Sequence, residues 1–255
     1  MGKVTKSFVV CATPRSGSTL LCALLAGTGV AGNPEEFFEH LWRTGLPRQP
    51  REYFAGVDDG GVIALLAPTD PGAVDRSDPF PPALERGTTE NGVFGAKLMW
   101  THLLDLAERV DRAADPALLE ERLPALRYVH VTREDKVAQA VSLWRAVQTR
   151  AWRSGDVKEE GVAVYHGAAI AHLVARLTEQ DEAWRAWFAA NSIEPFTIAY
   201  EALAGEVHAN VAAVLEHVGA GPAEIPEPPM RRQGDDRSAR WVERFRTSER
   251  EAVAP

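Results

Sequence analysis

The sequence predicts an α/β fold in which a central parallel sheet is flanked by helices, within one domain that covers residues 1–255. Three observations predict this fold class. Four apolar segments are short, as the strands of a parallel sheet buried on both faces are. Helical patterns follow most of these segments along the chain. The composition is 45% hydrophobic, which is enough for a substantial core. The expected strands are residues 8–12, 93–98, 127–132 and 196–199.

The expected helices are recognised by apolar residues that recur at helical spacing. The first three follow the first three strands directly, and a long fourth one carries Trp184 and Trp187 on its apolar side. We expect these two side chains, and Trp144, to be core residues. The predicted helices are residues 18–25, 103–110, 136–149, 168–190, 207–218 and 239–249.

Two proline-rich stretches interrupt this alternation. The insertion at residues 68–92 is too long for a simple connection, so it is either a surface flap or partly helical around residues 83–85. The second stretch, residues 219–236, leads into a basic turn. We expect this turn and the last helix to form a C-terminal element at residues 230–250.

Composition excludes several classes of function. The net charge of −8 argues against broad binding of nucleic acid or of anionic membranes. No apolar segment is long enough to span a membrane, and residues 1–7 do not resemble a secretory signal. Cys11 and Cys22 are expected to be buried free thiols, and the histidines lack partners at metal-ligand spacing. We therefore expect a cytoplasmic protein without a metal site.

The turn after the first strand has the composition of an anion-binding loop. Backbone N–H groups at the start of the following helix are unpaired, and the helix dipole places partial positive charge there. Gly17 allows a ligand to approach closely, and the Arg15 guanidinium suits phosphate or sulfate. Hydroxyl donors come from Ser16, Ser18 and Thr19. The alternative is a capped helix without a ligand. Because the lysine of nucleotide hydrolases and a metal-binding aspartate are missing, a nucleotide donor that needs no magnesium fits better than ATP or GTP.

Several motifs resemble those of sulfotransferases. Residues 14–21, Pro-Arg-Ser-Gly-Ser-Thr-Leu-Leu, look like the loop that binds the 5′-phosphosulfate of the donor. Arg133, followed nine residues later by Ser142, looks like the element that binds its 3′-phosphate. More specifically, the chain resembles the bacterial Stf0 family, whose founding activity is trehalose 2-sulfation, from Phe8 to Arg246. The segments that carry this resemblance are residues 30–38, 97–100, 144–150 and 237–244.

The resemblance implies a P-loop-like sulfotransferase fold, a homodimer, and the donor 3′-phosphoadenosine 5′-phosphosulfate (PAPS). It also implies transfer of a sulfuryl group to a sugar hydroxyl, which leaves adenosine 3′,5′-bisphosphate (PAP). Trehalose is the expected acceptor, and a glycosylated or hydroxylated natural product is the alternative. Trehalose enzymes of the family carry Gln, Glu and Trp where this chain has Pro14, Asn33 and Tyr53, at positions that line the sugar pocket. Such changes can redirect the choice of acceptor. Glu35, Glu36 and Phe37 complete the expected acceptor site.

The family pattern places the general base at Glu36. Gly32 and Pro34 mark a loop there, and the aromatic residues beside the carboxylate can desolvate it. Competing candidates are Glu35, Glu39 and His40, and an alternative is that these acidic residues form the first turn of a helix. Arg15 would stabilise the charge that develops on the departing 5′-phosphate.

Three further residues are candidates for the site. Arg232 precedes Gln-Gly and loosely resembles the Arg-Lys-Gly that closes over the 3′-phosphate in other sulfotransferases. Lys97 either faces the sulfuryl group or is a surface lysine. Trp241 either stacks on adenine or anchors the last helix to the core. A kinase-like enzyme that uses ATP, and a binding module that has lost catalysis, are the competing classes of function.

Overall fold

The computed structural model describes residues 3–39, 50–66, 77–149, 151–152, 163–228 and 236–253. The chain divides into two compact units. The first comprises Met1–Gly45, Ala73–Glu134 and Gln180–Pro229, and the second comprises Leu46–Gly72, Asp135–Glu179 and Met230–Pro255. The single domain expected from the sequence therefore stays a prediction.

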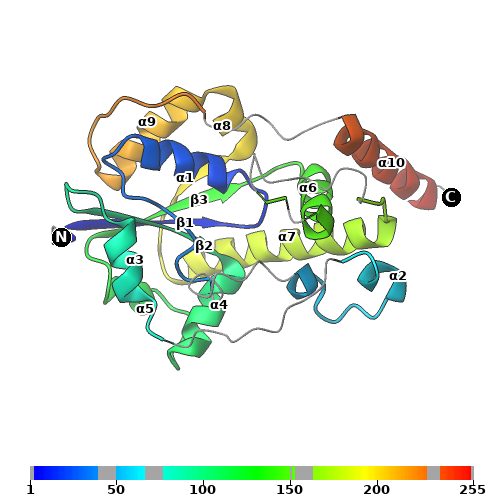
Figure 1. The fold of residues 1–255 in the computed structure, drawn as a ribbon, viewed down its shortest axis with the longest axis horizontal. Helices are drawn as coiled ribbons and strands as arrows, with labels where there is room; N and C mark the ends of the chain where they lie inside the picture. Colours follow the sequence, from blue (N-terminus) through cyan, green and yellow to red (C-terminus); the bar gives the residue numbers. More distant parts are fainter. Residues whose placement is uncertain are drawn as a thin grey trace. The chain divides into compact units, whose positions relative to one another are not determined.

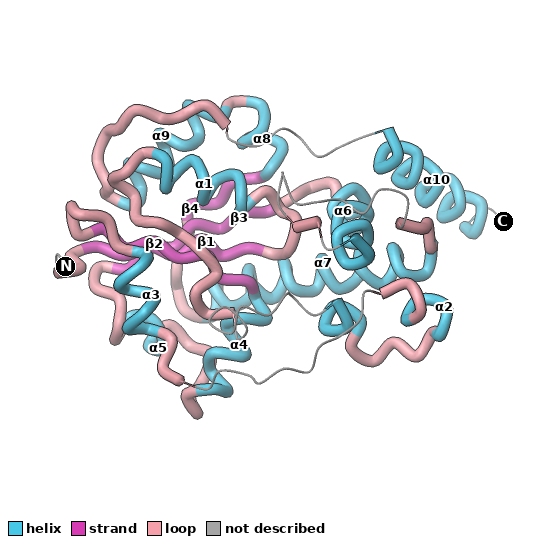
Figure 2. The backbone as a smooth tube through the Cα atoms, in the orientation of Figure 1, coloured by secondary structure: helices cyan, strands magenta, loops and turns pink. Residues whose placement is uncertain are grey.

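The first unit contains a parallel sheet of four strands in the order β2-β1-β3-β4 (Figures 1 and 2). β1 (Lys6–Ala12) pairs with both β2 (Val93–Met99) and β3 (Leu126–Thr132), and β4 (Phe196–Ala199) pairs with β3. The parallel α/β fold predicted from the sequence is confirmed. Because all four strands run in the same direction, their carboxyl ends lie along one edge of the sheet.

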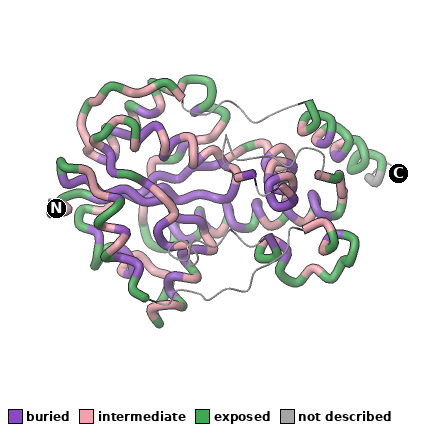
Figure 3. The backbone as a smooth tube through the Cα atoms, in the orientation of Figure 1, coloured by how far each residue is buried: buried purple, intermediate pink, exposed green. Residues whose placement is uncertain are grey.

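Helices cover both faces of this sheet (Figure 1). Alternate residues of β1 point to opposite faces, as the period of a strand requires. Phe8 and Val10 join a core with α1 (Ser18–Gly27) and α9 (Val207–Val218). Val9 and Cys11 join a core with α4 (Trp100–Arg109) and the last residues of α7 (Gly167–Ala190). Burial on both faces explains why the strands are continuous apolar runs (Figure 3).

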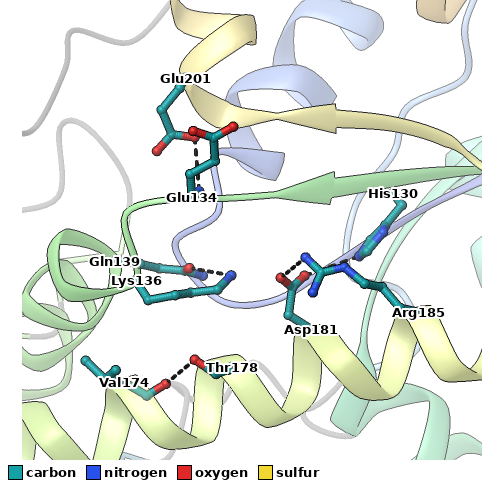
Figure 4. A network of polar contacts seen from close by, with 9 residues as sticks. All are labelled: His130, Glu134, Lys136, Gln139, Val174, Thr178, Asp181, Arg185 and Glu201. Atoms are coloured by element: carbon teal, nitrogen blue, oxygen red, sulfur yellow. Dashed lines mark hydrogen bonds and ion pairs between the residues drawn. The ribbon is translucent and has the colours of Figure 1, made fainter.

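A polar cluster around the buried Asp181 carboxylate lies within the first unit (Figure 4). The Asp181 carboxylate, on α7, approaches Nε2 of His130 on β3 at 3.4 Å and accepts a hydrogen bond from Arg185 at 2.8 Å. The Asp181 and His130 side chains are 1% and 2% exposed. The indole N–H of Trp184 donates to the carbonyl of Ala12 at 3.0 Å. These contacts attach α7 to β1 and β3, where the site begins.

The second unit has its own core. It contains η1 (Pro50–Phe54), α2 (Gly60–Ile63), α6 (Lys136–Thr149) and α10 (Asp236–Val253), together with the first residues of α7. Trp144, on α6, is completely buried in this core. Trp241, on α10, is 9% exposed and packs edge-on against Tyr165 with ring centroids 5.8 Å apart. Trp241 thus anchors the last helix, as one of the two interpretations predicted.

The proline-rich insertion is partly helical, as one of the two alternatives predicted. α3 (Phe80–Gly87) begins where the Asp78 carboxylate accepts the N–H of Phe80 at 3.0 Å. Two prolines follow Phe80, and proline is tolerated in a first helical turn because its missing N–H would be unpaired there. Residues 67–76 lie outside the described residues. α5 (Ala117–Glu120) and α8 (Tyr200–Gly205) were not predicted, because fewer than two turns carry no apolar period.

Both cysteines are free and buried, as predicted. Burial raises the pKa of the Cys22 thiol to about 11, against a smaller opposing effect of Lys97. Burial raises the pKa of the Cys11 thiol as well. Among the described residues, no three potential metal ligands gather into one group. None of the described helices combines the length and the apolar character that crossing a bilayer requires.

Candidate anion-binding and catalytic site

The loop between β1 and α1 curls because two of its residues adopt left-handed backbone conformations. Arg15 has φ +62° and Gly17 has φ +90°. The carbonyl of Gly17 accepts the N–H groups of Leu20 and Leu21, at 3.0 and 3.2 Å, and so starts the helix. Gly17 is the N-cap and has no side chain to cover the first turn. The N–H groups of this turn are therefore left for another acceptor, as at anion sites of this kind.

The hydroxyl groups of the loop differ in their surroundings. Ser16 is fully buried, and its Oγ has no hydrogen-bond partner among the described residues. A buried polar atom without a partner is costly, so a ligand that accepts this hydrogen bond would stabilise the loop. Ser18 is 2% exposed. Thr19 accepts a hydrogen bond from Lys97 Nζ at 3.0 Å. Binding of an anion by this loop stays a prediction, which the unpartnered Ser16 hydroxyl supports.

Lys97 joins this loop to the candidate base. Its Nζ lies 2.7 Å from Oε1 of Glu36, and the two side chains are only 6% and 10% exposed. Lys97 lies within β2, beside Val10 of β1. It is a buried residue of the site, so the surface-lysine interpretation is wrong: strand pairing places its side chain on the face that α1 covers. One ammonium group thus holds the Glu36 carboxylate and the Thr19 hydroxyl together.

The segment that carries Glu36 runs beside β2. The Glu35 carbonyl accepts the N–H of Lys97 at 2.8 Å, and Glu35 forms an isolated parallel bridge with Ala96. Phe37 and Phe38 are 1% and 0% exposed and belong to the core that contains Val9 and Cys11 of β1. The alternative that these acidic residues begin a helix is wrong, because residues 33–39 contain no helix. The buried rings of Phe37 and Phe38 and the hydrogen bond from Lys97 to the Glu35 carbonyl fix the position of the carboxylate.

The expected acceptor residues fall into different surroundings. Pro14 is buried at the start of the loop. Asn33 is exposed, and its side-chain amide donates to the Arg86 carbonyl at 3.3 Å. The Phe37 ring faces Phe94 at 6.3 Å within the core. Tyr53 belongs to the second unit, where its ring stacks on Trp152 at 5.7 Å. The role of each in binding an acceptor stays a prediction.

Arg133 lies beyond the carboxyl end of β3, as predicted, and contacts the loop between β1 and α1, residues 13–17, which we call the anion loop. Its NH1 donates to the carbonyl of Arg15 at 3.1 Å. Its guanidinium carbon lies 4.7 Å from the centre of the Tyr200 ring. Ser142 lies on α6 in the second unit, and Arg232 and His40 lie outside the described residues.

Sequence reasoning missed Tyr200 and the partners of Lys97. Tyr200 directly follows β4, so it lies at the carboxyl edge of the sheet, where the loops of parallel folds form their sites. That position was the available signal. No local pattern distinguishes this tyrosine from a packing residue, because its neighbours come from two other loops.

The fold and the site define a class of protein: an α/β protein whose first loop leads into a helix start without a side-chain cap and has a carboxylate nearby. A carboxylate next to such a loop can accept a proton from a group that attacks the bound anion. The chain matches the family model described as Stf0 sulphotransferase over residues 7–248. The protein belongs to the Stf0 sulphotransferase family.

Two relatives are similar over nearly their whole length. One is named trehalose 2-sulfotransferase, from Mycobacterium tuberculosis (strain ATCC 35801 / TMC 107 / Erdman). It is 45% identical over 257 residues, which cover 96% of each chain. The other has the same name and comes from Mycolicibacterium smegmatis (strain ATCC 700084 / mc(2)155). It is 43% identical over 256 residues, which cover 94% of each chain.

One solved structure resembles the fold more distantly. It is the sulfotransferase domain from the Synechococcus PCC 7002 olefin synthase, with a TM-score of 0.43 and 14% identity. The match covers 96% of this chain and 89% of that one. At this distance it carries no argument about the site.

Proposed function

We propose that this protein transfers a sulfuryl group from PAPS to the 2-hydroxyl of trehalose and releases PAP. Family membership supports sulfuryl transfer, and the names of two relatives at 43–45% identity support trehalose as the acceptor. The single observation that carries the mechanism is the buried contact of Lys97 with both Glu36 and Thr19. This contact supports Glu36 as a base beside the loop that would hold the donor.

The anion loop would bind the phosphosulfate of the donor. The N–H groups at the start of α1, the Ser16 hydroxyl and the Arg15 guanidinium are suited to its oxygens. By analogy with phosphoryl transfer, the flat transferred group is loosely bonded in the transition state, and negative charge grows on the departing 5′-phosphate. Donors that face this growing charge stabilise the transition state more than the ground state, which raises the rate. Arg133 would contact the 3′-phosphate, and the family resemblance implies the same role for Ser142 and Arg232.

Glu36 would act as the general base. As the acceptor oxygen forms its bond to sulfur, its proton passes to the Glu36 carboxylate. The bond between sulfur and the 5′-phosphate oxygen breaks, and its electron pair stays on that oxygen. The base must be ionised when the acceptor arrives, and the nearby Lys97 ammonium favours the ionised form of a buried carboxylate. We propose no metal in this reaction, because arginine and lysine would supply the positive charge.

A binding experiment tests the donor. Calorimetry should give tighter binding of PAP without metal than of ATP with magnesium. The reason is that the loop lacks the lysine of nucleotide hydrolases, whereas Arg133 would contact the 3′-phosphate of PAP. Preference for ATP would overturn the sulfotransferase proposal. Activity should survive a chelator, which tests the absence of a metal.

A transfer experiment tests the base and the acceptor. Incubation with isotopically labelled PAPS and a panel of disaccharides and hydroxylated metabolites should give a sulfated mass shift for trehalose. Glu36→Gln should keep its affinity for PAP and lower kcat by about 10²–10⁴-fold. Glu39→Gln is the matched control and should keep its turnover. Normal turnover of Glu36→Gln would remove Glu36 from the role of base, and transfer to another alcohol alone would remove trehalose.

We also propose that the protein is a cytoplasmic homodimer. This proposal rests on the family resemblance and on the reduced cysteines expected in that compartment. Sedimentation equilibrium of the purified protein would test the dimer, and a single species of monomer mass at micromolar concentration would contradict it.

A further inference from the structure

Tyr200 lies against the anion loop. A Cβ atom placed on Gly17 would collide with the Tyr200 ring, so the ring lies directly over the bare Cα of this glycine. Tyr200 is the first residue of α8 and directly follows β4. The close approach explains why the loop needs glycine here in addition to its positive φ. It also means that the Tyr200 ring limits how far the loop can uncurl on this side.

Arg133 contacts this ring as well and links it to the same loop. Its guanidinium carbon lies 4.7 Å from the centre of the Tyr200 ring, within the range of a cation–π interaction. The same guanidinium donates to the carbonyl of Arg15 at 3.1 Å. Arg15 and Gly17 are the two residues of the loop with positive φ, and this pair of side chains contacts both. An arginine with a left-handed backbone conformation is strained, so it persists only where surrounding contacts stabilise that conformation.

A second connection fixes the two side chains relative to each other. The carboxylate of Glu201 accepts the N–H of Glu134 at 3.2 Å (Figure 4). Glu134 follows Arg133 in the chain, and Glu201 follows Tyr200. The end of β3 and the start of α8 are thus joined twice, once by the cation–π contact and once by this hydrogen bond.

We propose that Tyr200 is a positioning residue that, with Arg133, holds the anion loop in its curled form and couples this loop to the subsite for the 3′-phosphate. The coupling to a nucleotide rests on the proposed function, whereas the effect on the loop does not. Arg133 then acts in two ways. It contacts the 3′-phosphate, and it keeps the loop that receives the 5′-phosphosulfate in shape. A nucleotide without the 3′-phosphate loses the first contribution only.

Hydrogen exchange of the ligand-free protein tests the effect on the loop. Tyr200→Leu should speed exchange of the Ser16, Leu20 and Leu21 amides, which are bonded within the loop, by about tenfold. Tyr200→Phe keeps the ring and should exchange at the wild-type rate. Amides of β1 serve as an internal reference for folding and should not change. Equal exchange of the loop amides in Tyr200→Leu and the wild type would overturn the proposal.

Nucleotide affinity tests the coupling. Arg133→Gln should weaken binding of adenosine 5′-monophosphate by about three- to tenfold and binding of PAP by about a hundredfold or more. When Arg133→Gln is added to a Tyr200→Leu protein, it should cause no further loss of affinity for the monophosphate. Most of its effect on the affinity for PAP should remain. If the two substitutions weaken binding of the monophosphate additively, the proposed coupling is wrong.

Two other outcomes are separated by these measurements. If Tyr200 only stacks on adenine, Tyr200→Leu weakens both nucleotides but leaves the exchange of the free loop unchanged, which refutes the proposal. If the wild type fails to bind PAP, the proposed function is wrong. Faster exchange of the loop in Tyr200→Leu would still support the positioning role.

Discussion

Replacing Lys97 by methionine removes the charge that faces Glu36 while keeping most of the side-chain length. The two side chains are 6% and 10% exposed, and the ammonium lies 2.7 Å from the carboxylate. Removal of one partner of such a buried pair leaves the other charge desolvated, at a cost of about 3–5 kcal/mol. The unfolding midpoint of a chain of this size should then fall by roughly 6–20 °C.

Chemical denaturation of four proteins tests this reasoning. They are the wild type, Lys97→Met, Glu36→Gln and the double variant. The double variant should be more stable than the sum of the single losses predicts, by about 1–3 kcal/mol, because the contact between the two side chains is lost only once. Arg112→Met is the control. It breaks an ion pair of 2.6 Å whose side chains are 39% and 56% exposed, and it should leave the midpoint almost unchanged.

Two outcomes would refute the argument. One is a Lys97→Met protein as stable as the wild type, which would mean that the carboxylate keeps enough water or other partners to need no ammonium. The other is strict additivity in the cycle, which would mean that the two side chains do not interact energetically.

Two further predictions concern the loop and the buried thiol. Gly17→Ala should destabilise the protein by about 1–3 kcal/mol and weaken PAP binding, because a left-handed alanine is strained and also meets Tyr200. Gly29→Ala is the control, because Gly29 has φ +71° but open space around it, so this variant shows the conformational cost alone. Equal losses of unfolding free energy in the two variants would mean that the collision with Tyr200 costs nothing. For Cys22, the native pKa of about 11 lies above the ordinary 9.0, so the unfolded thiol ionises first and stability is lost as the pH rises. Between pH 7 and pH 10 the wild type should lose about 1.4 kcal/mol more than Cys22→Ala, and parallel pH curves would contradict this burial effect.

Local patterns predicted most of the regular elements. The apolar runs of the four strands and the helical spacing of α6 and α9 gave bounds at or within two residues of those observed. α4 begins three residues earlier than expected, at Trp100, whose ring packs edge-on against Trp184 at 5.2 Å. That contact comes from a distant part of the chain, and local spacing carries no information about it.

The sequence by itself determined the strands, the loop that follows the first strand, and the family, because each is recognised from short runs of residues adjacent in the chain. Only the tertiary structure showed that Lys97 is buried against Glu36. It also showed that Tyr200 contacts Gly17 and that Arg133 donates to the carbonyl of Arg15. These residues come from separate strands and loops, and only the pairing of parallel strands brings the ends of those segments to one edge. Whether a charged side chain there is solvated or paired depends on neighbours far along the chain, which no local pattern specifies.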